Sequence, residues 1–162
     1  MKIEHLEERI VDYQNSIKTV VDKRVLWNTK IKNLLRTTLQ AIAKQYEIGW
    51  KVQELSWIHS NEAINITFDS FPDALIDCTN LIPAHQFLPG GALIFSQTYS
   101  GDIAFFIIFP ELDPTVQDNG ILELGIVEPH LITEKFVVEK VDEFLKEIIK
   151  WEVPSPAKKL GF

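Results

Sequence analysis

The first 48 residues carry a repeating pattern of apolar positions that predicts a long helical arm. No Gly or Pro interrupts the chain before Gly49, so propensity allows helix throughout this stretch. The first apolar positions recur at alternating steps of three and four, which is the heptad spacing of a helix that pairs with another helix. Such a row has to be buried against the rest of the chain or against a second copy. The row consists of Ile3, Leu6, Ile10, Tyr13, Ile17 and Val20.

A second apolar stripe runs from Trp27 to Tyr46, after the polar Arg24. Its steps are mostly of four residues, which suits a helix lying on a globular body better than a coiled coil. One possible geometry is an unbroken helix of about 45 residues, roughly 68 Å long at 1.5 Å per residue. The other is a helical hairpin that breaks between Asp22 and Asn28, with Asn28 as the N-cap of the second helix. We expect two helices, because helices beyond about 25 residues are uncommon in small domains.

Residues 49–130 have the pattern of strands joined by turns. Within 63–69 apolar and polar residues alternate, which is typical of a strand with one buried face. Short turns without intervening helices predict an antiparallel meander of four or five strands, with the helices covering one face. The expected strands are 50–58, 63–69, 92–99, 103–109 and 121–127.

A final helix is predicted from Thr133, a residue type that caps helices, to Trp151. The remaining tail, residues 153–162, is rich in proline and ends in Leu160 and Phe162. It is either a frayed end or a peptide that docks on a partner. The whole chain is therefore expected to be one α+β domain, with a helical arm (1–48), an antiparallel sheet (49–130), a helix packed on it (131–152) and a tail (153–162). The buried stripe expected for the helix is Val137, Val141, Phe144, Leu145 and Ile148.

Composition supports a globular domain and narrows its surroundings. The 162 residues are 46% hydrophobic and 24% charged, which excludes a disordered chain. A single cysteine, Cys78, cannot form an intramolecular disulfide. The longest apolar run, 103–109, is too short to cross a bilayer. The first residues are interrupted by acids and do not resemble a secretory signal. We therefore expect a cytoplasmic protein without a membrane segment.

The net charge of −7 is unevenly distributed. Residues 1–48 hold nine Lys and Arg against six acids, whereas 49–162 hold seven against seventeen. Twelve acids fall in 52–134, where no Lys or Arg occurs, so nucleic-acid binding by this region is not expected. The acids either keep the protein soluble or form a surface for a basic partner. The basic cluster of the arm is either solvated or paired with the acidic sheet region of the same or a neighbouring subunit. It comprises Lys23, Arg24, Lys30, Lys32 and Arg36.

Residues that could carry chemistry are few and scattered. Imidazole and carboxylate groups together can bind a transition metal or move protons. No pair of them has a spacing that would place both ligands on one helix face. Cys78 has neither an orienting partner nor an oxyanion hole signalled by the sequence. We therefore predict no catalytic residue, no metal and no cofactor. The candidates that an enzyme would have to use are His59, His85, His130, Asp77 and Asp118.

The function expected from these patterns is a non-enzymatic protein-interaction domain, of the adaptor, chaperone or immunity-protein kind. We expect a homodimer formed by the helical arm, with the acidic surface available to a protein partner. The alternative is an enzyme, or a binder of a small molecule or metal, that uses the His and Asp residues in the loops of the sheet region. The expected contact residues are Ile3, Leu6, Ile10, Tyr13, Ile17, Leu160 and Phe162.

Overall fold

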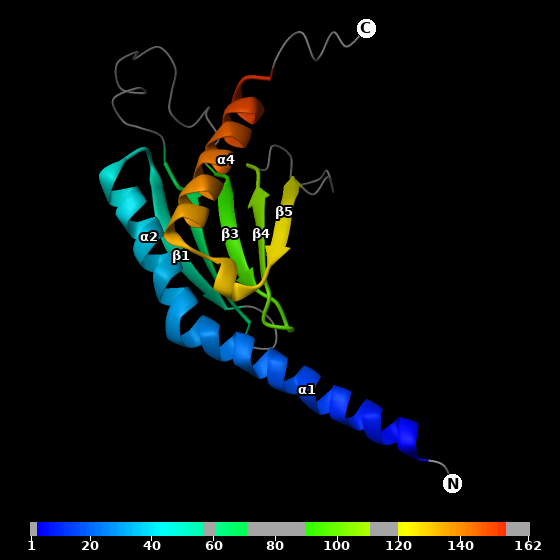
Figure 1. Cartoon of the computed structure of the whole chain (residues 1–162). Coiled ribbons are helices and arrows are strands. Elements are labelled where there is room, and N and C mark those ends of the chain that lie inside the picture. Colours follow the sequence, from blue (N-terminus) through cyan, green and yellow to red (C-terminus); the bar gives the residue numbers. More distant parts are fainter. Residues whose placement is uncertain (1–2, 57–60, 71–89, 111–119, 155–162) are drawn as a thin grey trace, which may run out of the picture.

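The computed structural model describes residues 3–56, 61–70, 90–110 and 120–154. They form an α+β fold in which a five-stranded antiparallel sheet is covered on one face by two helices (Figure 1). The strands follow one another in the order β1-β2-β3-β4-β5, so the predicted meander is confirmed. Their bounds are β1 Trp50–Ser56, β2 Glu62–Phe68, β3 Ala92–Gln97, β4 Ile103–Ile108 and β5 Ile121–Val127.

The N-terminal helix is continuous, and the expected hairpin is wrong. Helix α1 (Glu4–Leu26) passes into a π-helical segment, η1 (Trp27–Ile31), and then into α2 (Lys32–Gln45) without leaving helical geometry. The residue expected to cap a second helix, Asn28, lies inside η1. A π-turn admits one extra residue, so apolar side chains spaced by four stay nearly in line along the stripe. The helix therefore absorbs the change of apolar spacing without breaking.

The helices cover the sheet with the stripes that the sequence indicated. The α2 stripe buries Leu35 and Leu39, and η1 buries Trp27 and Ile31. The last helix, α4 (Glu134–Glu152), begins at Thr133, whose hydroxyl accepts a hydrogen bond from the Phe136 amide at 3.1 Å, as predicted. A short 3-10 turn, η4 (Pro129–Leu131), connects it to β5. The α4 side chains in the core are Val137, Val141 and Phe144.

The sheet presents its alternating side chains to two different clusters. One face, with Ile64, Ile66 and Phe95 among its residues, packs against the helices in the main core. The opposite face carries a smaller cluster of Ala63, Ala92 and Ile94. The alternation predicted for 63–69 is confirmed, since Ile64 and Ile66 belong to one face and Ala63 to the other.

Most of helix α1 projects away from this body. It extends beyond the sheet, and its N-terminal end lies far from the body formed by the strands, α2 and α4 (Figure 1). None of the 23 residues of α1 is buried, whereas Trp27, one residue beyond its end, is fully buried. The helical arm of the sequence thus consists of a projecting half and a packed half. No helix among the described residues is long and apolar enough to cross a membrane.

Candidate interaction surface

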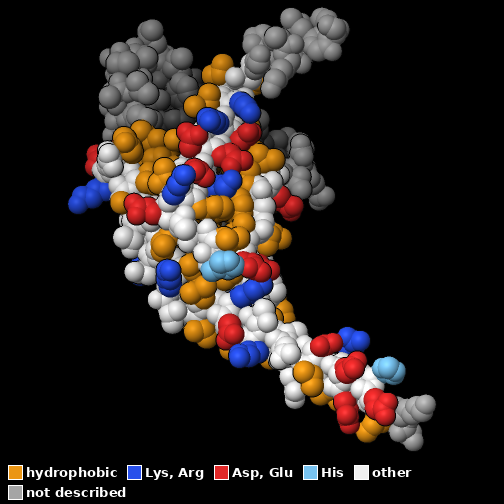
Figure 2. All heavy atoms as spheres, in the orientation of Figure 1, with side chains coloured by type: hydrophobic (Ala, Val, Ile, Leu, Met, Phe, Trp, Pro, Cys, Tyr) orange, Lys and Arg blue, Asp and Glu red, His pale blue; other side chains and the backbone are white. Residues whose placement is uncertain are grey.

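The most distinctive surface of the molecule is the apolar row along α1. From Ile3 to Ile17 its side chains are 45% to 65% exposed, with Tyr13 at the upper end, whereas Val20 is half-buried. Charged side chains surround these apolar groups on the projecting helix (Figure 2). Single exposed apolar residues are ordinary on a protein surface, but a row of them at heptad spacing has a preferred partner geometry. The structure exposes all five predicted contact residues of the arm: Ile3, Leu6, Ile10, Tyr13 and Ile17.

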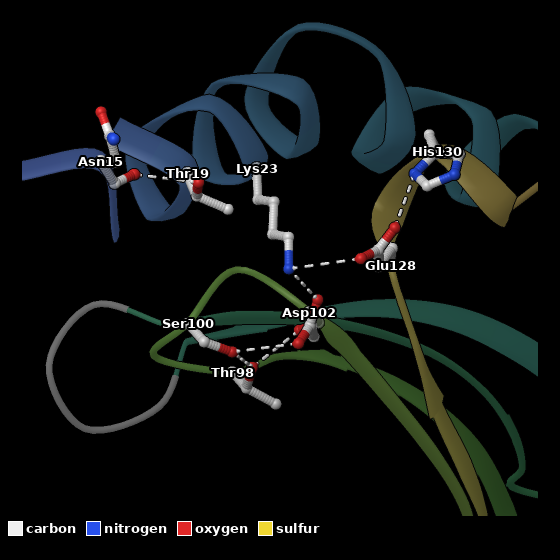
Figure 3. A network of polar contacts seen from close by, with 8 residues as sticks. All are labelled: Asn15, Thr19, Lys23, Thr98, Ser100, Asp102, Glu128 and His130. Carbon is white, nitrogen blue, oxygen red and sulfur yellow. Dashed lines mark hydrogen bonds and ion pairs between the residues drawn. The ribbon is translucent and has the colours of Figure 1, made fainter. Parts of the chain in front are cut away.

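The base of α1 is fixed to the sheet by a polar network centred on Lys23 (Figure 3). The Lys23 amine donates to Asp102 at 2.8 Å and lies 3.8 Å from Glu128. Its neighbour Arg24 donates to the side chain of Asn61 at 3.0 Å and to the carbonyl oxygens of Thr98 and Tyr99. Two adjacent helical residues thus hold the loops at the end of the sheet. The orientation of α1 relative to the body is set by this network and by Trp27 in the core.

The hydrogen bond from Lys23 to Asp102 has a consequence for the titration of the amine. It raises the pKa of Lys23 above the ordinary 10.5, the attraction of Asp102 and Glu128 adds to this, and partial burial works against it. The amine therefore stays charged throughout the physiological range, and the network does not act as a switch near neutral pH.

The turn between β3 and β4 approaches α1 so closely that it requires glycine. Gly101 has a φ of +90°, in the left-handed region that side chains disfavour. A Cβ at this position would lie 2.5 Å from the Cβ of Lys23 and 3.3 Å from the Arg24 amide nitrogen. The turn at residues 100–102 is therefore also the surface on which the end of α1 rests.

The basic cluster of the arm is largely engaged inside the chain. Lys32 pairs with Glu62 at 2.6 Å and Arg36 with Glu54 at 2.5 Å. With Lys23 and Arg24, four of the five cluster residues contact the sheet or its loops, and Lys30 is the exception among the described contacts. The alternative in which the cluster pairs with the acidic region of the same chain is the one observed.

These pairs also account for much of the acid in the central region. The structure describes seven of the twelve acids in residues 52–134. Five of these seven form an ion pair with a Lys or Arg of the same chain. The five are Glu54, Glu62, Asp69, Asp102 and Glu128.

The residues considered for chemistry do not assemble within the described part of the chain. His130 is exposed, with Nδ1 3.4 Å from a carboxylate oxygen of Glu128. Among the described residues no group of three or more His, Cys, Asp or Glu could hold a metal ion. The other candidates lie outside the described residues, as do Cys78 and the tail residues Leu160 and Phe162; these candidates are His59, His85, Asp77 and Asp118.

A groove lies between α2 and α4, and the sequence did not predict it. It has a volume of about 380 Å³, and Ile42, Tyr46 and Trp50 line one side of it. Val138 and Leu145 line the other side, with Asp142 as its only acidic residue. Trp50 lies on β1, and Val138 was not part of the stripe predicted for the last helix. The apolar stripes of the two helices indicated Ile42, Tyr46 and Leu145 as core. They could not indicate that the stripes diverge near the end of α2 and leave a space.

Two buried polar atoms lack a hydrogen-bond partner in the described structure, Trp27 Nε1 and Asn65 Oδ1. Trp27 belongs to the core on the helical face of the sheet. Asn65 alternates with Ile64 and Ile66 along β2 and therefore points to the opposite face. The sheet separates the two atoms, so they do not form one site.

Comparisons with protein-family models, with curated proteins and with solved structures find no match for this chain. By its geometry alone, the protein is an α+β domain with an exposed helical arm that carries apolar residues at heptad spacing.

Proposed function

We propose that this protein is a non-enzymatic interaction module that forms a homodimer through α1. The observation that carries the proposal is the combination of a heptad row on α1 with the absence of any buried residue in that helix. A row of this spacing is complementary to a copy of itself, because a twofold axis brings the same surface of each chain together.

The physical chemistry of an isolated helix supports a partner for α1. Most of the stability of a helix in a protein comes from the packing of its apolar face and not from helix propensity. No described part of the chain buries the row up to Ile17. Helix α1 contains one internal ion pair, between Arg9 and Asp12, in which both groups are exposed. Such a pair contributes about 0.3–0.5 kcal/mol. Packing against a second α1 would supply the burial that this helix lacks.

The size of the row indicates a dimer that dissociates on dilution. Complete burial of a large apolar side chain contributes about 1.5–3 kcal/mol. The five exposed residues of the row in each of two chains are about half exposed, so burying the exposed parts of all ten contributes roughly 8–15 kcal/mol. Association of two proteins costs an estimated 4–15 kcal/mol, which is of similar size. We therefore expect reversible pairing and not a permanent complex.

The proposal assigns the contact to α1 and not to the acids of the sheet. Most of the described central acids already face basic groups of the same chain, which leaves the acidic surface with less charge to offer a basic partner. An adaptor, chaperone or immunity-like role would use the dimer to present the sheet and its loops to another protein. A cytoplasmic location stays a prediction of the sequence.

The alternative of an enzyme or metal binder has less support. Of the five residues it would use, His130 alone lies in the described part of the chain, and it is exposed beside Glu128.

The proposal is tested with two matched substitutions to Glu on α1. Ile10→Glu places a charge in the row, whereas Asn15→Glu places the same side chain on the opposite face of the helix. Light scattering of the full chain at a concentration well above the expected micromolar midpoint should give a dimer mass for the wild type and for Asn15→Glu, and a lower mass, approaching that of one chain, for Ile10→Glu. Circular dichroism verifies that both variants stay folded. A monomeric wild type, or a dimer that Ile10→Glu leaves intact, would overturn the proposal.

A further inference from the structure

We infer that the two α1 helices of the dimer run antiparallel, with the twofold axis passing between the levels of Val11 and Asp12. This inference rests on the proposed homodimer and specifies its geometry. Three features of α1 support it: where the row becomes covered, how charge is distributed along the helix, and how the apolar layers match.

The first feature is that its own chain begins to cover the row at Val20 and covers it completely at Trp27. Residues of the row are exposed through Ile17, Val20 is half-buried, and Trp27 is fully buried in the core. Arg24, which continues the heptad spacing, contacts the loops of the sheet. The helix is continuous through η1 into α2. In a parallel pair, the partner's helix would continue along this row into the space that the sheet occupies. In an antiparallel pair, the partner's α1 begins at this level and runs away from the body.

The second feature is a division of charge along α1. The first half, residues 4–12, holds four acids against Arg9, a balance of −3. The second half, residues 13–24, holds three basic residues against Asp22, a balance of +2. The axes of paired helices lie about 8–10 Å apart. This distance is close to the screening length of roughly 8 Å at physiological salt, so charges on the two helices still interact. An antiparallel pair places the acidic half beside the basic half, whereas a parallel pair places like charges together.

This argument does not depend on Lys23, which is already engaged with Asp102. Without it, the second half of α1 still has a positive balance, from Lys18 and Arg24 against Asp22. The helix dipoles also favour the antiparallel pair, because the positive N-terminal end of each dipole then lies on the side of the other helix's negative C-terminal end.

The third feature is that the row forms matched layers in this arrangement. Ile3 packs beside the partner's Val20, Leu6 beside the partner's Ile17, and Ile10 beside the partner's Tyr13. Each layer then recurs through the twofold axis, and the contact extends over about 26 Å of helix. The contact therefore uses the exposed positions from Ile3 to Ile17 together with the half-buried Val20, and it ends where each body begins.

The experiment is site-specific crosslinking of the full chain with a short bismaleimide, in a Cys78→Ala background. In the antiparallel pair, Leu6 and the partner's Ile17 share a layer, whereas two Leu6 positions are about 16 Å apart along the axis. A mixture of Leu6→Cys and Ile17→Cys proteins should crosslink, and either protein alone should not. Asn15→Cys, on the opposite face, is the control that should not crosslink in any combination.

A second pair of variants keeps every apolar side chain in place. Arg9→Cys and Ser16→Cys lie on the same flank of the row, which faces the same flank of an antiparallel partner. They too should crosslink in the mixture only. Crosslinking of Leu6→Cys with itself, in a sample that light scattering shows to be dimeric, would overturn the antiparallel arrangement and leave the proposed dimer intact. A monomer mass without crosslinks would instead overturn both.

Discussion

Replacing Gly101 by Ala should destabilise the protein by disturbing the contact between the β3–β4 turn and the base of α1. The φ of +90° is unfavourable for any residue with a Cβ, and such strain costs about 1–3 kcal/mol. The added Cβ would also lie 2.5 Å from the Cβ of Lys23, so the turn or the helix would have to shift. We expect a total loss of about 2–4 kcal/mol, since overpacking of a tight contact contributes roughly 1 kcal/mol or more.

Urea unfolding followed by circular dichroism measures this loss. With a slope of about 2 kcal/mol per molar, the midpoint should fall by roughly 1–2 M. Ser100→Ala, in the same turn, is the matched control. It removes an exposed hydroxyl that hydrogen-bonds Thr98 and Asp102, and it should lower the midpoint much less than Gly101→Ala. Protein concentration has to be the same in all samples, because dimer formation also contributes to stability.

A double-mutant cycle separates strain from clash in this prediction. In a Lys23→Gly background the nearest atom that Gly101→Ala would meet, the Lys23 Cβ, is absent. The clash part of the penalty should therefore decrease and the strain part should remain. If Gly101→Ala instead lowered stability by less than about 0.5 kcal/mol, within the range of ordinary surface substitutions, the reasoning about this contact would be wrong.

Three further substitutions test other parts of the structure. Thr133→Ala removes the hydroxyl that accepts the Phe136 amide and should lower stability by about 1 kcal/mol in urea unfolding. Leu39→Ala opens a cavity in the core beneath α2 and should cost about 2–5 kcal/mol in the same assay. Lys23→Met removes the amine that pairs with Asp102, and the stability lost relative to wild type should be constant from neutral pH to about pH 10 and shrink above 10.5.

The pH dependence in the last prediction follows from the direction of the pKa shift. The pKa of Lys23 is higher in the folded chain than its ordinary 10.5, so its contribution is fully present below 10.5 and is lost as pH rises through the folded value. A difference between wild type and Lys23→Met that instead grew above pH 10.5 would contradict the assigned hydrogen bond. For the other two substitutions, unchanged urea midpoints would show that the cap or the core contact was assigned incorrectly.

Local patterns were sufficient to predict most of the fold. The alternation in 63–69 identified which side chains of β2 face the helices, and Thr133 marked the start of α4 to the residue. These features depend on neighbouring residues of the same element, so a sequence pattern contains them.

The course of the N-terminal helix depended on contacts between distant residues, and there the prediction failed. The break was expected between Asp22 and Asn28 because helices beyond about 25 residues are uncommon in small domains. Arg24 lies within that stretch, at the polar position between the two apolar stripes. In the structure its guanidinium binds loops that are 37 to 75 residues away in the chain, so the helix remains intact through a polar position. The groove between α2 and α4 was missed for a similar reason, because the angle between two packed helices is not contained in either stripe.

For the candidate surface, the sequence identified the row but not its surroundings. The heptad spacing named the five residues that the structure exposes, and it left open whether the chain itself covers them. That depended on where the body ends, which is set by Lys23, Gly101 and Trp27 together.

Sedimentation equilibrium of the full chain over a wide range of concentrations tests the central claim most directly. We predict that the mass rises with concentration from the 18.6 kDa of one chain to twice that value, with the midpoint in the micromolar range. We also predict that Ile10→Glu moves this transition to much higher concentration, while Asn15→Glu leaves it in place. A mass of one chain at every concentration up to the highest attainable would contradict the account.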